Sequence, residues 1–256
     1  MDQNELTYIK IPYPHAKDLH LKITVPICTL DIFPGIGNVW VTGKYLDPKV
    51  VMPLNITHSE NVAQIIAVGA FAYRTPKKYL PELKLSFGRL HPFSLSISAG
   101  DISDHINLGG IPLTSLEIQY GAGNQVLDFS YENPQVMSRM KVEAGGGLVE
   151  IDHLANASTG EIYLKGDTTN YRVDFGGEIK QNTNLHFGTA VSSGEITIPV
   201  NTPVKITSGS PPTSSSKDDF LYSEKAYWNK LARDQKEPLL HIFDAGLYDP
   251  LRLNYF

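Results

Sequence analysis

The chain has 256 residues, with 22 Lys and Arg against 27 Asp and Glu, giving a formal net charge of −5. It has no basic run, which excludes the clustered positive face that nucleic-acid binding requires. Hydrophobic residues make up 41% and charged residues 19%, as in an ordinary globular domain. The single cysteine, Cys28, excludes an intramolecular disulfide, and its apolar surroundings at residues 25–32 predict a buried, inert thiol.

The first clear element in the chain is an alternating strand that enters a glycine turn at residues 30–38 (LDIFPGIGN). The pattern returns at residues 116–124 (LEIQYGAGN), and residues 94–100 and 140–147 share its rhythm. A unit this small cannot bury its own apolar face, so repeated copies must stack on one another. The pattern therefore predicts an architecture before it predicts any chemistry.

Residues 43–92 interrupt this rhythm. Prolines break the segment into short pieces, with strand-like runs at residues 62–71 and 83–87. We expect a sheet-rich insertion, or a cap over the end of the stack, because an uncapped end exposes strand edges.

Downstream of this segment, five aligned copies of the repeat follow at spacings of 21 to 24 residues. Taking the strand position of Ile97 as a marker, we expect its equivalents to be Ile118, Val142, Leu164 and Leu185, with Leu95, Leu116, Met140, Ile162 and Thr183 two positions earlier. A second strand in each copy fills residues 106–108, 127–129, 149–151, 173–175 and 196–198. Apolar residues alternate with polar ones throughout, which predicts strands with one buried face. The fold class expected is all-β: a β-solenoid-like stack of strand–turn–strand repeats with one short C-terminal helix.

Three regions are expected along the chain: a repeat β domain at residues 1–206, a flexible linker at 207–217 rich in Ser and Pro, and a tail at 218–256. The tail should contain a helix from Ser223 to Arg233, with Ser223 as its N-cap. Residues 240–242 and 251–253 then form a degenerate late copy of the repeat, so we expect the tail to dock back onto the stack.

A family resemblance rests on residues 111–118 (IPLTSLEI) and the Gly-Ala-Gly at 121–123, which resemble the signature LPLT-x-L-x-(I/V)-x-x-GAG. The match continues through Asn133-Pro134, the glycines at 145–147 and residues 153–157 (HLANA). Residues 240–242 and 244–247 resemble the end of the same domains. The chain is thus similar, over residues 20–42 and 94–256, to toast-rack domains. These are related to the C-terminal domain of Lia-type cell-wall-active antibiotic response proteins and to adhesin-like domains.

The resemblance implies a β-solenoid-like stack and a non-enzymatic role at the bacterial cell envelope, in a stress response or in adhesion. It supplies no catalytic residue, cofactor or metal. Residues 1–5 do not predict a signal peptide, and the longest apolar run, residues 62–73, is too short to span a bilayer. We therefore expect membrane association only through segments outside this chain.

Possible sites of chemistry are few. The glycine turns at 35–37 and 121–123 lack the third glycine and following helix of a dinucleotide site, so they are interpreted as structural turns. Outward carboxylates could form rows on the stack, as in β-helical glycosidases, although a solvated polar face explains them more simply. This set comprises Asp31, Glu117, Glu143, Glu150, Asp128 and Asp174. The eight histidines show no metal-ligand spacing, and His186 and His241 are expected on the surface.

The remaining feature is an aromatic group near the C-terminus. Phe220, Tyr222, Tyr227 and Trp228 could form a partner surface, although packing of the tail against the stack is the simpler use of such residues. The function expected is therefore a non-enzymatic sensing or adhesion module that binds a protein or a cell-surface polymer. The alternatives are a β-helical carbohydrate-active enzyme and an architectural protein that assembles with itself.

Overall fold

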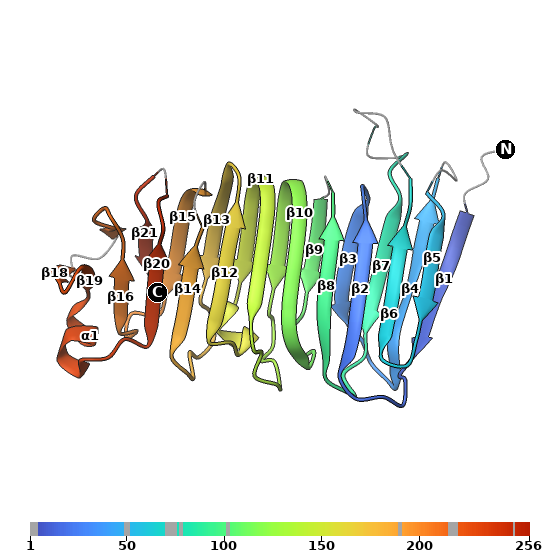
Figure 1. Ribbon diagram of the computed structural model, residues 1–256, viewed down its shortest axis with the longest axis horizontal. Coiled ribbons are helices and arrows are strands. Elements are labelled where there is room, and N and C mark those ends of the chain that lie inside the picture. Colours follow the sequence, from blue (N-terminus) through green and yellow to red (C-terminus); the bar gives the residue numbers. More distant parts are fainter. Residues whose placement is uncertain are drawn as a thin grey trace.

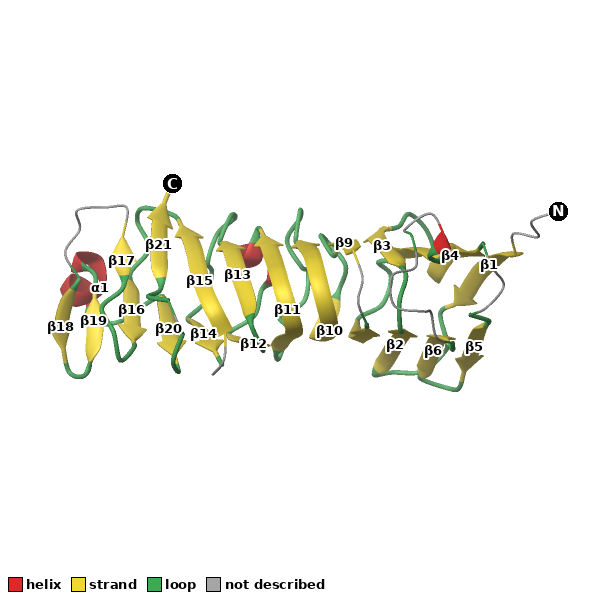
Figure 2. Cartoon of the chain, turned by 90° about the horizontal axis from the view of Figure 1, so that it is seen from above, coloured by secondary structure: helices red, strands yellow, loops and turns green. Residues whose placement is uncertain are grey.

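The computed structural model describes residues 5–48, 52–69, 76, 79–100, 103–188, 191–214, 220–247 and 249–256. Its strands form a long stack with two layers (Figures 1 and 2), which bears out the all-β stacked fold expected from the sequence. One short helix, α1 (Lys230–Gln235), and a 3₁₀ turn at Leu154–Ala157 accompany the strands.

The first layer contains, in spatial order, β5 (Leu54–His58), β6 (Val62–Ala67), β2 (Leu19–Val25), β8 (Phe93–Ala99), the first halves of β10 (Leu113–Asp128) and β11 (Met140–Asp152), β12 (Glu161–Gly166), β14 (Thr183–Phe187), β20 (Leu240–Asp244), β16 (Val204–Thr207), β19 (Ala226–Trp228) and β18 (Leu221–Ser223). The central strands, from β6 to β16, are parallel.

The second layer contains β1 (Glu5–Pro12), β4 (Val39–Asp47), β7 (Glu82–Phe87), β3 (Thr29–Pro34), β9 (Ser103–Asn107), the second halves of β10 and β11, β13 (Thr169–Asp174), β15 (Val191–Ile198), β21 (Arg252–Tyr255) and β17 (Thr213–Ser214). A first-layer strand and the second-layer strand that follows it form one rung. The loops that lead from one rung to the next are called return loops here.

The glycine turns lie at the corner between the layers. In β10 and β11 the strand is not interrupted there but bends from one layer into the other (Figure 1). Gly123 and Gly147 are paired at this bend, with φ of 140° and 99°, and a Cβ at Gly147 would collide with the Gly123 carbonyl. Only glycine permits both the backbone conformation and the close approach of the two rungs.

The core lies between the layers and consists of rows of apolar side chains that run along the stack. One such row contains Ala63, Leu21, Leu95, Leu116, Met140, Ile162, Leu185, Ile242 and Ile206, all of them buried. Each buried aliphatic side chain contributes about 1.5–3 kcal/mol relative to an exposed one. Cys28 is 1% exposed within this core, and burial raises the pKa of its thiol to about 12, as expected of an inert cysteine.

The register of two predicted copies is wrong by two residues. Leu164 pairs with Phe187, not Leu185, and Leu127 pairs with Ile151, not Val149. A slip of two residues leaves every side chain on the same face of its strand, so alternation in the sequence cannot detect it. The glycine-turn copy at residues 30–38 is also misassigned: Ile32 belongs to β3 and aligns through Ile106 with Leu127 in the second layer, not with Ile118.

Spatial order departs from sequence order at both ends of the stack. The rung of β6 and β7, from residues 43–92, lies outside the earlier rung of β2 and β3. At the other end, β20 lies between β14 and β16, while β21 lies between β15 and β17. Within the segment expected as a linker, Thr213 and Ser214 pair with β21; residues 215–217 lie outside the described residues, as do 70 and 71 at the end of an expected strand.

The helix expected from Ser223 to Arg233 begins later than predicted. Residues 221–228 form the hairpin β18–β19, and α1 starts after Asn229, whose side-chain oxygen accepts from the Ala232 N–H at 2.9 Å. The aromatic residues at 222, 227 and 228 favour paired strands over helix, which explains the error. Among the described residues, no helix is long and apolar enough to cross a membrane.

Candidate functional site

The outward carboxylates that could have formed a catalytic face are largely engaged in ion pairs along the stack. Asp31 pairs with Lys84 at 3.2 Å, Glu117 and Glu143 with Lys141 at 3.1 and 3.0 Å, and Glu150 with Arg172 at 2.5 Å. Each cation lies on the strand next to its partner or on the same strand, so neighbouring rungs neutralise one another. This arrangement is that of a solvated structural face.

A shorter row of carboxylates lies near the ends of the second-layer strands. Asp128 pairs in register with Asp152, and Asp174 follows Val173, the partner of Ile151. His153 Nδ1 lies 2.8 Å from Asp128 Oδ1, and this hydrogen bond raises the pKa of His153. Burial, reinforced by Asp128, raises the pKa of Asp152. In the part of the chain that the structure describes, no group of three or more His, Cys, Asp or Glu is arranged to hold a metal ion.

The histidines expected on the surface join an aromatic row on the outer face of the first layer. His186 stacks between Tyr163 and Phe243, with ring centroids 4.7 and 4.5 Å apart and nearly parallel planes. Both faces of the His186 ring are therefore covered, and no sugar ring can stack on it. His241 lies against Phe243 and Thr207 and is half-buried, and burial lowers its pKa to about 4.

The four aromatic residues expected to form a partner surface lie in or beside the β18–β19 hairpin. The structure brings Tyr222, Tyr227 and Trp228 together: the two tyrosine rings are 5.0 Å apart, and Lys205 Nζ lies 4.7 Å from the Trp228 ring centre. Tyr222 is 62% exposed, whereas Phe220 and Tyr227 pack partly against the core. The partner surface stays a prediction, and Tyr222 is its most accessible member.

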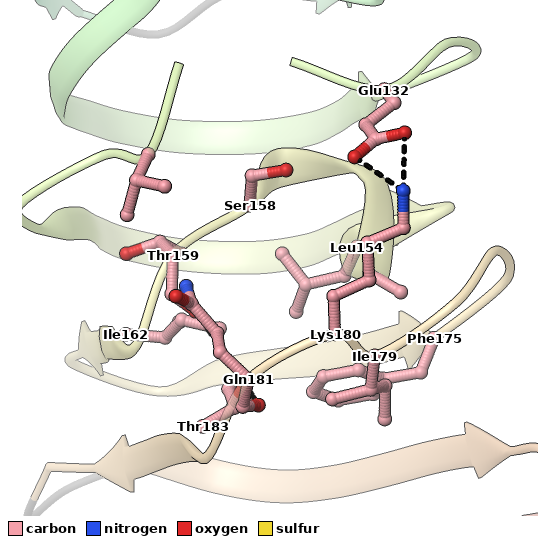
Figure 3. Close-up of a pocket in the computed structure, with 12 residues that line it drawn as sticks. Glu132, Leu154, Ser158, Thr159, Ile162, Phe175, Ile179, Lys180, Gln181 and Thr183 are labelled. Carbon is pink, nitrogen blue, oxygen red and sulfur yellow. Dashed lines mark hydrogen bonds and ion pairs between the residues drawn. The ribbon is translucent and has the colours of Figure 1, made fainter. Parts of the chain in front are cut away.

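Sequence reasoning missed a pocket among the return loops (Figure 3). Three loops enclose a cavity of about 250 Å³: the loop between β10 and β11, the loop between β11 and β12, and the loop between β13 and β14. Buried Leu154, Ile162 and Phe175 supply apolar walls, together with half-buried Ile179.

The rim of this pocket is polar and internally paired. Lys180 Nζ donates to both carboxylate oxygens of Glu132 at 2.7 Å, so the first loop is tied to the third across the mouth (Figure 3). With its amide oriented to satisfy the facing donors, Gln181 Oε1 accepts from the backbone N–H of Thr159 and of Gly160 at 3.2 and 3.0 Å. Val136, also at the pocket, is 70% exposed.

Two asparagine side chains, one buried (Asn133) and one half-buried (Asn156), help to hold these loops in place. Asn133 bonds to Leu113 and to the Ala157 carbonyl, while its backbone N–H donates to the Asn156 carbonyl at 2.7 Å. Asn156 in turn donates to the Phe129 carbonyl at 2.9 Å. The loops are therefore fixed before any ligand arrives, which lowers the entropic cost of binding. Only the family resemblance had drawn attention to residues 133–134 and 153–157.

Comparisons with known proteins give a likeness of fold. No family model matches the chain, and no curated protein matches it in sequence. The crystal structure of a putative cell adhesion protein from Clostridium sporogenes ATCC 15579 is similar over 99% of this chain and 100% of that one, with a TM-score of 0.54 and 14% identity. A putative adhesin from Bacteroides fragilis NCTC 9343 aligns over 100% of this chain and 98% of that one, with a TM-score of 0.46 and 9% identity.

Proposed function

We propose that this chain is a non-enzymatic binding module of the bacterial cell surface that holds a protein partner through the return-loop pocket. The observation that carries this proposal is the pocket itself: a preformed cavity with apolar walls, on an edge of the stack made of fixed loops. Loops held on a rigid scaffold are the usual place for binding residues. The similarity in fold to a putative cell adhesion protein supports the same reading.

The walls and rim define the chemistry of the partner. Leu154, Ile162 and Phe175 favour an aliphatic or aromatic side chain. The Glu132–Lys180 pair has no net charge, so it does not select a charged group but can exchange hydrogen bonds with a peptide backbone. A short peptide segment with one apolar anchor residue fits both features.

Catalysis is the weaker alternative because five of the six outward carboxylates are paired. Glycoside hydrolysis needs two carboxyl groups free to act as acid and as base or nucleophile across a bound sugar. Here Asp31, Glu117, Glu143 and Glu150 each lie within 3.2 Å of a cation, and Asp128 bonds to His153. The resemblance to Lia-type and toast-rack domains points the same way and supports placement at the envelope.

The test uses a random peptide library panned against the purified chain. We expect enriched peptides to share an aliphatic or aromatic residue, and Val136→Glu at the pocket to weaken their binding about tenfold or more. The matched control is Val200→Glu, because Val200 is 54% exposed and is not among the residues that line the pocket. Tyr222→Ala tests the hairpin as the competing contact surface.

Two results would contradict the proposal. The pocket is not the contact site if enriched peptides bind the Val136→Glu and wild-type proteins equally. The protein is an enzyme if it releases reducing ends from cell-wall glycans and this turnover vanishes in Asp128→Ala or Asp174→Ala.

A further inference from the structure

The outermost strands of the two layers differ in the length of their unpaired edges. In the described part of the chain, the first layer ends in β5 and β18, and the second layer ends in β1 and β17. These strands have five, three, eight and two residues respectively. The strand β1 pairs with β4 on one side only, so it is the longest strand with an open edge in the described residues. Such an edge offers unpaired backbone groups to another strand.

Only half of β1 carries the features that protect natural edge strands. Lys10 and Pro12 lie in its second half, and its register with β4 shifts between Ile11 and Pro12. A lysine, a proline and an irregular register are all common ways to prevent edge-to-edge pairing. From Leu6 to Ile9 the strand has no charge and no proline, and it exposes two large apolar side chains: Leu6 is 45% and Tyr8 78% exposed.

We propose that β1 is a self-association site, at which a second copy of this chain adds its own β1 in antiparallel register centred on Thr7. In this register Leu6 of each copy lies opposite Tyr8 of the other. The dimer therefore contains two equivalent Leu6–Tyr8 pairs, and each of these exposed apolar side chains gains an apolar neighbour. Directly opposite residues in antiparallel strands have Cβ atoms about 4.5–5.5 Å apart, and aromatic–aliphatic pairs of this kind stabilise sheets.

The symmetry of the strand favours a second copy of this chain over an unrelated protein as the partner. Leu6 and Tyr8 lie at equal distances along the strand from Thr7, which makes the surface complementary to itself under a two-fold axis, as an isologous dimer requires. In this register residues 5–9 of one copy pair with residues 9–5 of the other. Lys10 and Pro12 lie outside this paired segment, and no like charges lie opposite one another. The residue numbers of opposite residues differ by an even number, so side chains that point outward in one copy lie beside outward side chains of the other. The second layer therefore continues from copy to copy.

A register centred one residue later is less favourable. Pairing centred on Tyr8 would place Lys10 opposite Leu6 and would bring the Pro12 end closer to the partner strand. The first layer is compatible with end-to-end pairing, because its outer strand, β5, lies at the same end of the stack as β1 (Figure 2). Two stacks can therefore meet with both layers aligned.

The first measurement is the molar mass of the full chain by size-exclusion chromatography with light scattering, from 1 μM to 1 mM. We expect a concentration-dependent dimer, and at least a tenfold weaker association for Leu6→Lys combined with Tyr8→Lys. The matched control is Leu90→Lys with Tyr131→Lys, two changes at sites that are 54% and 67% exposed on loops. Circular dichroism confirms that both double variants fold, since all four sites are on the surface.

The second measurement tests the register by cross-linking. Antiparallel partners have Cα atoms about 4.5–5.5 Å apart, within the range that a disulfide spans. Thr7→Cys should therefore form a disulfide-linked dimer under mild oxidation, whereas Tyr131→Cys should not; the native Cys28 is 1% exposed and does not interfere. A strict monomer at 1 mM overturns the proposal. So does a dimer that survives the Leu6 and Tyr8 changes, or one that Thr7→Cys fails to link.

Discussion

The side chain of Asn133 hydrogen-bonds both backbone groups of Leu113, the first residue of β10. Its Oδ1 accepts from the Leu113 N–H at 3.1 Å, and its Nδ2 donates to the Leu113 carbonyl at 3.0 Å. One carboxamide thus takes the place of a neighbouring peptide group at the start of the strand. The same Nδ2 also approaches the Ala157 carbonyl at 3.3 Å, so a single buried residue, 4% exposed, joins the start of β10 to the return loop that follows β11.

Replacement of Asn133 by Ala should therefore destabilise the fold markedly. Each buried backbone group left without a partner costs about 1–3 kcal/mol, and we expect a loss of about 2–4 kcal/mol in the free energy of unfolding. The measurement is urea unfolding followed by circular dichroism. Asn170→Ala is the control, because Asn170 is exposed and bonds only at the surface, to Ser193. A loss no larger than that of Asn170→Ala would show that water replaces the side chain at no cost.

Asp104 should make stability depend on pH in an unusual direction for a carboxylate. Burial at the inner face of β9, where it is 7% exposed, raises the pKa of Asp104 from 3.8 to about 7. The folded state then holds the proton more tightly than the unfolded state. Its stability contribution is complete below pH 3.8 and is lost as pH rises towards 7.

The isosteric variant Asp104→Asn tests this linkage because it cannot ionise. We expect it to match the wild type near pH 4 and to exceed it by up to about 4 kcal/mol at pH 8, since one pKa unit corresponds to 1.36 kcal/mol. Urea unfolding at both pH values gives the difference. Glu117→Gln, at an exposed carboxylate paired with Lys141, is the control. Parallel stability curves for the Asp104→Asn and wild-type proteins would contradict the expectation.

Two histidines in this protein should have pKa values shifted in opposite directions. Burial lowers the pKa of His241 to about 4, and the nearby Lys205 acts in the same direction. The hydrogen bond to Asp128 raises the pKa of His153. The His241 contribution to stability is therefore present above pH 6.5 and lost as pH falls towards 4, whereas that of His153 is present below pH 6.5 and lost as pH rises through its folded pKa.

Proton NMR titration of the imidazole C2–H signals measures both values, with His241→Gln and His153→Gln to assign them. We expect one midpoint near 4 and the other above 6.5. The half-buried environment described for His241 is wrong if its signal titrates at the ordinary value of a solvated imidazole, about 6.5.

The hairpin β18–β19 has an unfavourable turn that can be improved. Glu224 and Lys225 form its two-residue loop with φ of 53° and 62°, a left-handed conformation that neither side chain favours. Glu224→Asn with Lys225→Gly should therefore stabilise the protein by about 1 kcal/mol. Thermal unfolding followed by circular dichroism measures the gain. The same Asn-Gly pair placed in α1, by Asp234→Asn with Gln235→Gly, should instead destabilise it; a gain in both places would show that the turn is not the cause.

Particular residues show how far the sequence could predict the fold. The alternation of Leu95 and Ile97, of Leu116 and Ile118 and of Leu127 and Phe129 places each of these side chains correctly in the core. It could not choose between Leu185 and Phe187 as the neighbour of Leu164, because both face the same way. The residues around Ser223 satisfy helix-start statistics, yet their aromatic neighbours pair as strands once β16 is beside them.

The pocket could not be predicted from spacing at all. Its walls come from Leu154 on one return loop and from Phe175 and Ile179 on another, and its rim joins Glu132 to Lys180, 48 residues apart. No periodic pattern connects such positions, since loops follow no repeating geometry.

By itself, then, the sequence determined that the chain stacks short strands and where glycine allows a bend, because alternation and φ are local properties of the backbone and its side chains. Tertiary structure alone decided the register of the rungs, the placement of β6 outside β2 and of β20 between β14 and β16, and the meeting of three loops around one cavity. These features depend on which surfaces pack together, and packing energy is shared among residues far apart in the chain.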